Sequence, residues 1–443
     1  MPFLVAAVNV AIPTIGREFA VEARVTAWLG TIFFLSIAMV QVPFGRLADI
    51  YGRKRLMVIG FIVTIIASCL GAVASSVAVL LVSLALTGVG SGIMFNNSIS
   101  ILTSVFPAES RGRALGISTA GTYTALSLGP YIGGVLTEAF GWHSIFVVSG
   151  IMGVVLLLLV FYALKGEWRE AEGEKFDAIG SVTYAVSLGL FIYGFSTLPD
   201  ILGVILVVLG LTGFIFFARL ESRTESPIFY IELFRQNRVF LFSCLAVFVS
   251  YISTFAIGFL LNLYLQYIKG LSPQTAGLIM IVASGLMAIL TPLSGRVSDK
   301  IEPRLVASLG MSLSFVALLL LVFLKGDTEL WYVILALGIN GLGIGIFASP
   351  NTNAIMGSLE RRFLGVGAGT LGTMRTTGMM VSMGIMMILF SLYIGDEQIS
   401  SKLPDFLRSV STGFIIFSGL SFLSIFIQFA ARRAKGRNAS ESL

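Results

Sequence analysis

The stretch that decides the fold is Gly45-Arg46-Leu47-Ala48-Asp49-Ile50-Tyr51-Gly52-Arg53-Lys54-Arg55, which comes directly after an apolar segment. A shorter copy, Gly295-Arg296-Val297-Ser298-Asp299, follows another apolar segment in the second part of the chain. Two further echoes come after each copy in the same order: Gly88-Val89-Gly90-Ser91-Gly92-Ile93 with Gly341-Leu342-Gly343-Ile344-Gly345-Ile346, and Arg111–Gly116 with Glu360–Gly365. This order predicts two homologous halves, the usual arrangement of a secondary transporter.

The composition indicates which solvent surrounds the chain. Of its 443 residues, 56% are hydrophobic and 12% are charged, whereas a soluble domain has about 25% charged residues. The mean hydropathy is +0.95. A soluble core could not enclose this much apolar surface, so we predict an all-α, polytopic membrane protein. The single histidine, His143, argues against a His-based metal site.

Fourteen apolar segments are predicted to be transmembrane helices, and all except the first are long enough to cross a hydrocarbon core of about 30 Å. They are 1–16, 27–44, 56–75, 77–104, 114–137, 142–164, 178–197, 201–219, 239–266, 275–294, 305–324, 331–356, 364–394 and 410–431. Because the segment 1–16 is short, we expect the native protein to begin upstream of Met1.

The basic residues predict the orientation. With both termini inside, 6 of the 29 Lys and Arg residues fall outside, Arg375 falls within a segment, and the other 22 lie on the cytoplasmic side. This asymmetry follows the positive-inside rule. It explains the net charge of +6 as membrane topology, so no nucleic-acid partner is needed.

The repeat also locates an insertion. Eight apolar segments separate the two copies of the Gly-Arg pattern, where two fused six-helix halves would give six. We therefore predict an N-terminal six-helix bundle over 1–164 and a linker with two inserted transmembrane helices over 165–238. A C-terminal six-helix bundle follows over 239–431, and a basic cytoplasmic tail over 432–443.

The repeated pattern has a physical reason. Its glycine permits close approach of helices, and its carboxylate can meet a helix N-terminus or a nearby arginine as a breakable cytoplasmic latch. An ordinary basic loop is the alternative for one copy, and the second copy favours the latch. We assign a conformational switch to Gly45, Arg46, Asp49, Gly52, Arg53, Gly295, Arg296 and Asp299.

The segment 114–137 carries a second pattern, Gly121 followed by Gly129-Pro130-Tyr131-Ile132-Gly133-Gly134. Proline removes a backbone hydrogen bond, and glycines permit a bend and tight packing. Such a helix can seal the two halves against leakage. An ordinary glycine-rich packing face is the alternative.

These motifs resemble those of the major facilitator superfamily, and the resemblance covers essentially the whole chain. Gly45–Arg55 resembles the loop 2–3 signature of that family, and Gly121 with Gly129–Gly134 resembles the motif of its antiporters and exporters. Gly141–Phe146, Ser349–Met356 and Arg375–Gly378 are similar to stretches of the same branch. With fourteen segments, the resemblance is to the fourteen-helix drug:proton antiporters, and it implies the major facilitator fold and multidrug efflux.

The chain departs from that branch at the residues linked to proton coupling. The stretch Asn9-Val10-Ala11-Ile12-Pro13 is present, but Leu4 stands where the branch has an acidic residue. Leu84 likewise stands where the family has an arginine. Glu138 is the nearest membrane carboxylate, and we favour an interfacial position for it over a proton-carrying role.

Arg375 is the charge that needs an explanation, because it falls near the predicted midplane. A central arginine costs roughly 2.5 kcal/mol or more, so it should face a water-filled cavity or a partner. Substrate contact or gating, and pairing with helix carbonyls or Asn side chains, both stay open. The further cavity candidates are Asn96, Asn97, Asn262, Asn340, Asn351 and Asn353. Each of these could instead form a helix–helix hydrogen bond.

We expect a secondary active transporter that exports small amphipathic or drug-like molecules by alternating access, coupled to protons as the resemblance implies. One alternative is a facilitator or importer of an organic anion or metabolite that uses Arg375. A membrane sensor or enzyme is a second, disfavoured because the sequence shows no catalytic cluster and no soluble signalling domain. We expect a monomer in the cytoplasmic membrane, with lipid, substrate and protons as partners and no cofactor or metal.

Overall fold

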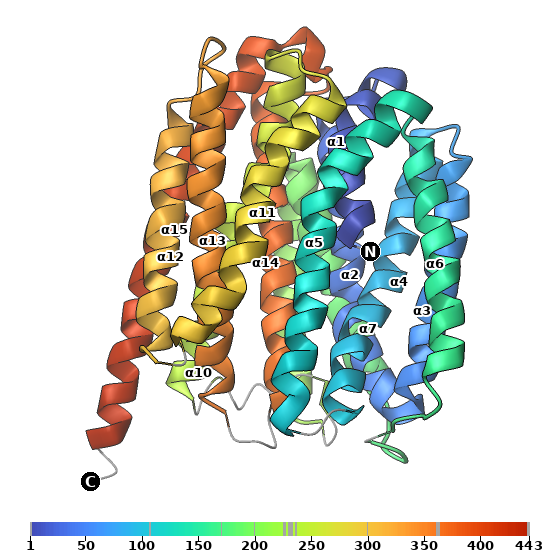
Figure 1. Ribbon diagram of the computed structural model, residues 1–443, viewed down its shortest axis with the longest axis vertical. Coiled ribbons are helices and arrows are strands. Elements are labelled where there is room, and N and C mark those ends of the chain that lie inside the picture. Colours follow the sequence, from blue (N-terminus) through green and yellow to red (C-terminus); the bar gives the residue numbers. More distant parts are fainter. Residues whose placement is uncertain are drawn as a thin grey trace.

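The computed structural model describes residues 2–105, 108–169, 171–198, 200–224, 227–228, 234, 237–298, 300–359 and 364–440. Within these ranges the regular structure is helical, which confirms the all-α prediction (Figure 1). The α-helices are α1 (Pro2–Glu18), α2 (Ala23–Tyr51), α3 (Arg53–Ala72), α4 (Val77–Val105), α5 (Ala108–Phe140), α6 (His143–Ala163), α7 (Ala178–Thr197), α8 (Ile201–Glu221), α10 (Arg238–Leu263), α11 (Pro273–Ser298), α12 (Pro303–Val322), α13 (Leu330–Met356), α14 (Leu364–Tyr393) and α15 (Leu403–Ser440).

Most of these helices are long and apolar enough to cross a bilayer. In the described part of the chain, 12 helices meet that requirement. Outside this set are α1, which has 17 residues, and α5. The protein is therefore a multi-pass membrane protein, and its spans face lipid with residues such as Ile151 and Leu159 of α6, which are exposed.

The helices form two groups that meet along two seams. In the first group α3 packs against α4 and α6, α2 against α4, and α1 against α5. In the second group α12 packs against α13 and α15, α10 against α14 and α15, and α11 against α13. The groups meet where α5 packs against α11 and where α2 packs against α14 (Figure 1). In the sequence repeat α2 corresponds to α11 and α5 to α14, so each seam pairs a helix of one group with the counterpart of the helix at the other seam.

Helices α7 and α8 pack against each other, and α7 also contacts both α2 and α14. Tyr184, Leu188 and Ile192 of α7 form a buried cluster with Leu35 of α2 and Met380 of α14. The helix pair predicted as an insertion therefore covers the α2–α14 seam and touches both groups.

The bundle has two ends, named here by the connections that they carry. The basic end holds the α2–α3 junction at Gly52, the linker 164–177 and the start of α10, at the bottom of Figure 1. The opposite end holds the connections 19–22, 269–272 and 394–402. Helix α1 starts about halfway along the bundle, where the letter N stands in Figure 1.

Candidate functional site

The two groups are joined toward the opposite end by hydrogen bonds to α1 from α10 and from the π-helical turn Tyr264–Ile268 that follows it. Pro13 lies inside α1 and has no N–H, so the carbonyl of Asn9 lacks its usual intrahelical donor. Asn262 Nδ2 of α10 donates to that carbonyl oxygen at 2.6 Å. Gln266 Nε2 donates to the carbonyl of Val10 at 2.9 Å. The Asn–Pro stretch thus offers the second group an acceptor that an unbroken helix would not provide.

Further contacts extend this joint toward the end of the bundle. Arg24 Nη2 of α2 donates to Ser391 Oγ of α14 at 2.9 Å. The backbone N–H of Ala23 donates to the carbonyl of Glu397 at 3.0 Å. These bonds tie the start of α2 to the end of α14, so the α2–α14 seam is closed on this side.

The α5–α11 seam depends on glycine at each side. A Cβ on Gly134 of α5 would lie 2.6 Å from the carbonyl oxygen of Pro273, and a Cβ on Gly277 of α11 would collide with the carbonyl of Pro130. Backbone therefore packs directly on backbone between the groups, the close approach that small residues allow in membranes.

Other glycines of the same helix pack inside the first group. A Cβ on Gly129 would lie 2.6 Å from Cβ of Ala6, and one on Gly133 would lie 2.5 Å from Cα of Ala7 in α1. Gly121 is different, because it is exposed and no atom that the structure describes lies within 4 Å of where its Cβ would be. The glycine pattern is tightly packed toward the opposite end and open toward the basic end.

Arg375 lies between the two groups, part-way along α14. Its guanidinium carbon is 5.3 Å from the ring centre of Phe95 on α4 and 6.0 Å from that of Tyr251 on α10. Both distances are within cation–π range. Phe95 is 36% exposed, and no carboxylate in the described part of the chain pairs with Arg375. A cation held by two aromatic rings from different groups is an arrangement that can recognise a planar or anionic molecule.

One turn of α14 also carries a polar contact across the α2–α14 seam. Thr376 Oγ1 donates to Gln41 Oε1 of α2 at 3.2 Å, and both residues are buried. A Cβ on Gly372 would lie 2.8 Å from Gln41 Nε2. Gln41 is thus held against the turn of α14 that also carries Arg375.

The asparagine candidates do not form one cluster. Asn262 bonds α10 to α1, as described above, and Asn353 Nδ2 donates to Ser298 Oγ at 2.6 Å, joining α13 to α11. Asn97 Nδ2, Asn340 Oδ1 and Asn351 Nδ2 are buried and form no hydrogen bond with the residues that the structure describes. The side chain of Asn96 lies outside the description.

At the α2–α3 junction the residues predicted to form the switch contact one another and the linker. Arg53 Nη2 is 2.8 Å from Asp49 Oδ1, and its Nε donates to the same oxygen at 2.9 Å. The backbone N–H of Arg53 donates to the carbonyl of Trp168, and that of Ala171 donates to the carbonyl of Asp49, each at 3.1 Å. Arg46 pairs with Glu174.

Gly52 is the turn between α2 and α3, with φ of +118°, a conformation that side chains disfavour. A Cβ there would lie 2.6 Å from Cδ of Glu167. Gly45 lies within α2. The linker therefore lies directly on the first copy of the repeated motif.

At the α11–α12 junction the second copy has other neighbours. A Cβ on Gly295 would lie 2.7 Å from Ser349 Oγ of α13, and Ser294 Oγ donates to the carbonyl of Gly345 at 2.9 Å. Arg296 is exposed. Asp299 lies outside the described residues.

The positions associated with proton coupling are apolar and packed. Leu4 and Leu84 are 1% and 2% exposed and belong to the same buried cluster. Glu138, near the opposite end of α5, is exposed.

Sequence reasoning missed the partners of Arg375 and the two buried glutamines, Gln41 and Gln266. The two glutamines could have been found from the sequence, since each is a polar residue in an apolar segment. No feature of the sequence distinguished Phe95 and Tyr251 from the other aromatic residues of the apolar segments.

Comparison with known proteins identifies the family. The Major Facilitator Superfamily model matches residues 1–239 and 243–442. The chain belongs to the major facilitator superfamily. The family is one of transporters, so this member is a transporter of small molecules and is not an enzyme.

Relatives support this membership in the superfamily, and a solved structure shares the fold. The chain is 30% identical to the riboflavin transporter RibZ of Clostridioides difficile over 83% of the chain and 80% of that protein. It is 26% identical to the multidrug resistance protein Stp of Mycobacterium tuberculosis (90% and 75% covered) and 27% identical to the methylenomycin A resistance protein of Bacillus subtilis (88% and 84%). A bacterial homologue of the human lysosomal transporter Spinster shares the fold, with a TM-score of 0.66 at 16% identity over 98% of this chain and 94% of that one.

Proposed function

We propose that this transporter exports small amphipathic, ring-containing molecules through a site between the two helix groups, next to Arg375. The observation that carries the proposal is the position of the Arg375 guanidinium over Phe95 of the first group and Tyr251 of the second. A planar molecule that inserts between the cation and a ring would contact both groups at once. Two relatives are named for resistance to drugs or to an antibiotic, which supports the outward direction.

The proposed cycle is alternating access, with rocking of one group against the other. We propose that the basic end faces the cytoplasm, that both termini are inside, and that all fourteen helices, α1 and α5 included, cross the membrane. The groups correspond to the six-helix bundles 1–164 and 239–431, with the α7–α8 pair inserted between them. The hydrogen-bonded joint at the opposite end and the open space at Gly121 support an inward-open conformation.

We further propose membership of the fourteen-helix drug:proton antiporter branch, with the proton gradient as the energy source. Because Leu4 and Leu84 have no titratable group, a coupled proton must bind elsewhere in this chain. The dependence of transport on an imposed pH gradient is the direct test of coupling.

A second candidate function is the transport of an organic anion or a flavin-like metabolite. Two observations favour it: no described carboxylate pairs with Arg375, and a relative of 30% identity is named a riboflavin transporter. In this case Arg375 itself recognises the charge or the electron-rich edge of the substrate.

The test is flux into inverted membrane vesicles that contain the transporter. A cationic dye, an anionic dye and labelled riboflavin are each measured with and without a pH gradient, for the parent chain, Arg375→Ala and the exposed control Lys300→Ala. Gradient-driven uptake of the cationic dye supports drug antiport. If only the anionic dye or riboflavin moves, and this flux is lost in Arg375→Ala but kept in Lys300→Ala, the result favours the transport of an organic anion or a flavin-like metabolite. Unchanged flux of every probe in Arg375→Ala contradicts the site.

A further inference from the structure

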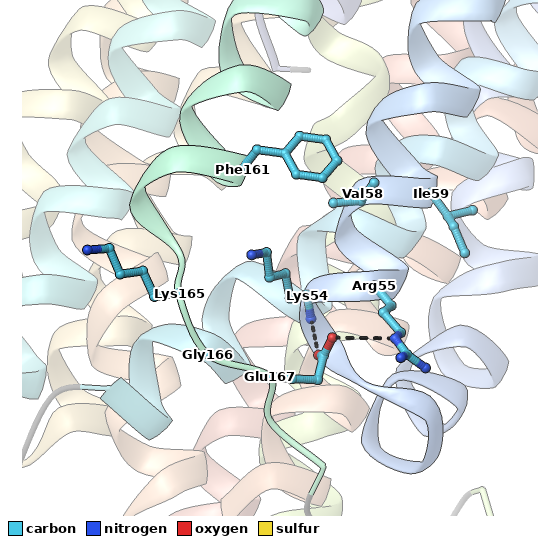
Figure 2. Close-up of a pocket in the computed structure, with 8 residues that line it drawn as sticks. All are labelled: Lys54, Arg55, Val58, Ile59, Phe161, Lys165, Gly166 and Glu167. Carbon is cyan, nitrogen blue, oxygen red and sulfur yellow. Dashed lines mark hydrogen bonds and ion pairs between the residues drawn. The ribbon is translucent and has the colours of Figure 1, made fainter.

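A hollow at the basic end lies on the outer surface of the first group, away from the seams. It has a volume of about 510 Å³ and lies between the start of α3 and the end of α6. Its lining residues are Lys54, Arg55, Val58, Ile59, Phe161, Lys165, Gly166 and Glu167 (Figure 2). None of the transport proposals above uses this hollow.

The lining is divided into a charged part and an apolar part. Lys54, Arg55 and Lys165 supply three cations, and Glu167 is the single carboxylate. Figure 2 shows Phe161, Val58 and Ile59 on the side of the hollow toward the body of the helices, with Lys54, Arg55 and Glu167 below them. The hollow therefore carries an excess of positive charge at its outer side and an apolar wall above it.

Part of the cationic charge remains available for a ligand. Glu167 accepts a hydrogen bond from the backbone N–H of Lys54 at 2.8 Å, and its other oxygen is 3.9 Å from Arg55 Nε. Lys54 Nζ donates to the carbonyl of Leu164 and keeps two further hydrogens. The Arg55 side chain is 68% exposed, and Lys165 forms no ion pair with a residue that the structure describes.

The apolar wall continues along the lipid-facing surface. Ile59 is 45% and Phe161 54% exposed, and the next turns of α3 and α6 expose Ile62 and Leu158. Both helices are among those long and apolar enough to cross a membrane. The ends of such helices lie at the headgroup level of a bilayer. The cations of the hollow therefore lie near the phosphates of the lipids, and the apolar wall lies near their acyl chains.

We propose that this hollow binds an anionic phospholipid, with the phosphodiester between Arg55, Lys165 and Lys54 and one acyl chain along Ile59 and Phe161. Basic pockets between membrane helices are a recognised form of lipid binding site. The cations at the outer side of the hollow and the apolar wall beside them suit the headgroup and the acyl chain of one lipid molecule. A soluble phosphate would contact only the cations, so the lining favours a lipid. This inference does not depend on the identity of the transported substrate.

The experiment is a lipid titration of the purified, delipidated full-length chain, followed by native mass spectrometry. Phosphatidylglycerol and phosphatidylcholine with identical acyl chains are compared on the parent chain, on Arg55→Gln/Lys165→Gln, and on Arg223→Gln/Lys300→Gln. The last variant makes the same charge change at exposed residues of the same end. Glu167→Gln changes the charge in the opposite direction, because it removes the single carboxylate of the hollow.

We expect the first phosphatidylglycerol to bind the parent chain at least tenfold more tightly than phosphatidylcholine. Each basic residue near anionic lipid is worth about 1 kcal/mol, so Arg55→Gln/Lys165→Gln should weaken phosphatidylglycerol binding by on the order of 30-fold. Arg223→Gln/Lys300→Gln should stay within about twofold, and Glu167→Gln should bind more tightly because the single carboxylate is neutral.

Equal losses in the two double variants, or no preference for phosphatidylglycerol in the parent chain, would overturn the site. Displacement of the lipid by soluble glycerol phosphate would overturn the assignment to a lipid, because the acyl chain would then add nothing. Thermal unfolding of each variant in detergent shows that the comparison is made on folded protein.

Discussion

The same Gly-Arg-x-small-Asp pattern ends α2 and α11, but the two junctions that follow are built differently. Between α2 and α3 there is a single residue, Gly52, with positive φ. Between α11 and α12 there are four residues, 299–302. A buried arginine follows each junction, Arg53 at 5% and Arg304 at 7% exposure. The duplicated halves therefore keep the pattern and the buried cation, while the turn that holds them differs.

The neighbours of the two junctions differ even more. The linker leading to α7 covers the first junction through the backbone of Trp168 and Ala171 and through the Arg46–Glu174 ion pair. The second junction is held by α13, through the bond from Asn353 to Ser298. Because α7 also packs on α2 and α14, the inserted pair contacts the α2–α14 seam, and the linker that leads to it contacts the first junction. We infer that the insertion makes the first junction the stiffer one.

Among the variants that test the difference between the two junctions, Gly52→Ala is expected to have the largest effect on stability and transport. A side chain at φ of +118° costs about 1–3 kcal/mol, and its Cβ would also displace Glu167. We expect a lower unfolding temperature and roughly a tenfold loss of transport. Gly173→Ala is the matched control, since its φ is +89° and no described atom lies within 4 Å of the added Cβ. Equal losses in the two variants would show that backbone strain alone is responsible and that contact with the linker is unimportant.

Asp49→Asn is expected to be the next largest change. It removes the charge that accepts two bonds from buried Arg53, and bonds to charged groups contribute about 1.5–3 kcal/mol. We expect transport to fall by somewhat less than the roughly tenfold loss of Gly52→Ala, and to fall further than in Asp299→Asn. Initial rates at matched expression measure both variants. The same rate in each would contradict the ranking and would make the two copies functionally equivalent.

Much of the fold could be predicted from the sequence, because apolar length and a repeated pattern are local signals. Each apolar segment corresponds to one helix, and the extra pair falls at α7 and α8. The contacts at the sites could not be predicted in the same way. Arg46 meets Glu174 across 128 residues, and nothing distinguishes Phe95 from the other phenylalanines among 35. Asn262, a cavity candidate, forms the hydrogen bond between helices that was the alternative for it, to the Asn9 carbonyl that Pro13 leaves without a donor.

A smaller effect is expected at the second junction from Asn353→Ala. The lost bond to Ser298 Oγ, at 2.6 Å, is worth about 0.5–1.5 kcal/mol, which should appear as a modest decrease of the unfolding temperature. Ser298→Ala provides the second arm of a double-mutant cycle, and we expect the double variant to lose less than the sum of the single losses. Strictly additive losses would mean that the bond does not hold α13 to α11.

The smallest effect is expected for the Arg46–Glu174 pair, which joins the linker to α2. Its side chains are 18% and 46% exposed, and pairs of this kind contribute about 0.2–1 kcal/mol. A double-mutant cycle of Arg46→Gln and Glu174→Gln on the unfolding temperature should give a small coupling energy that decreases with added salt, because exposed charges are screened.

The control for this cycle is Arg296→Gln, the counterpart of Arg46 in the second copy, whose side chain is exposed. We expect Arg296→Gln to leave the unfolding temperature within error of the parent chain at every salt concentration. If Arg296→Gln matched Arg46→Gln, the linker would add nothing to the first junction, and the difference between the two junctions would reduce to the turn at Gly52. If only Arg46→Gln responded, the inserted pair would hold one of two homologous switches through its linker, an asymmetry that duplication alone does not produce.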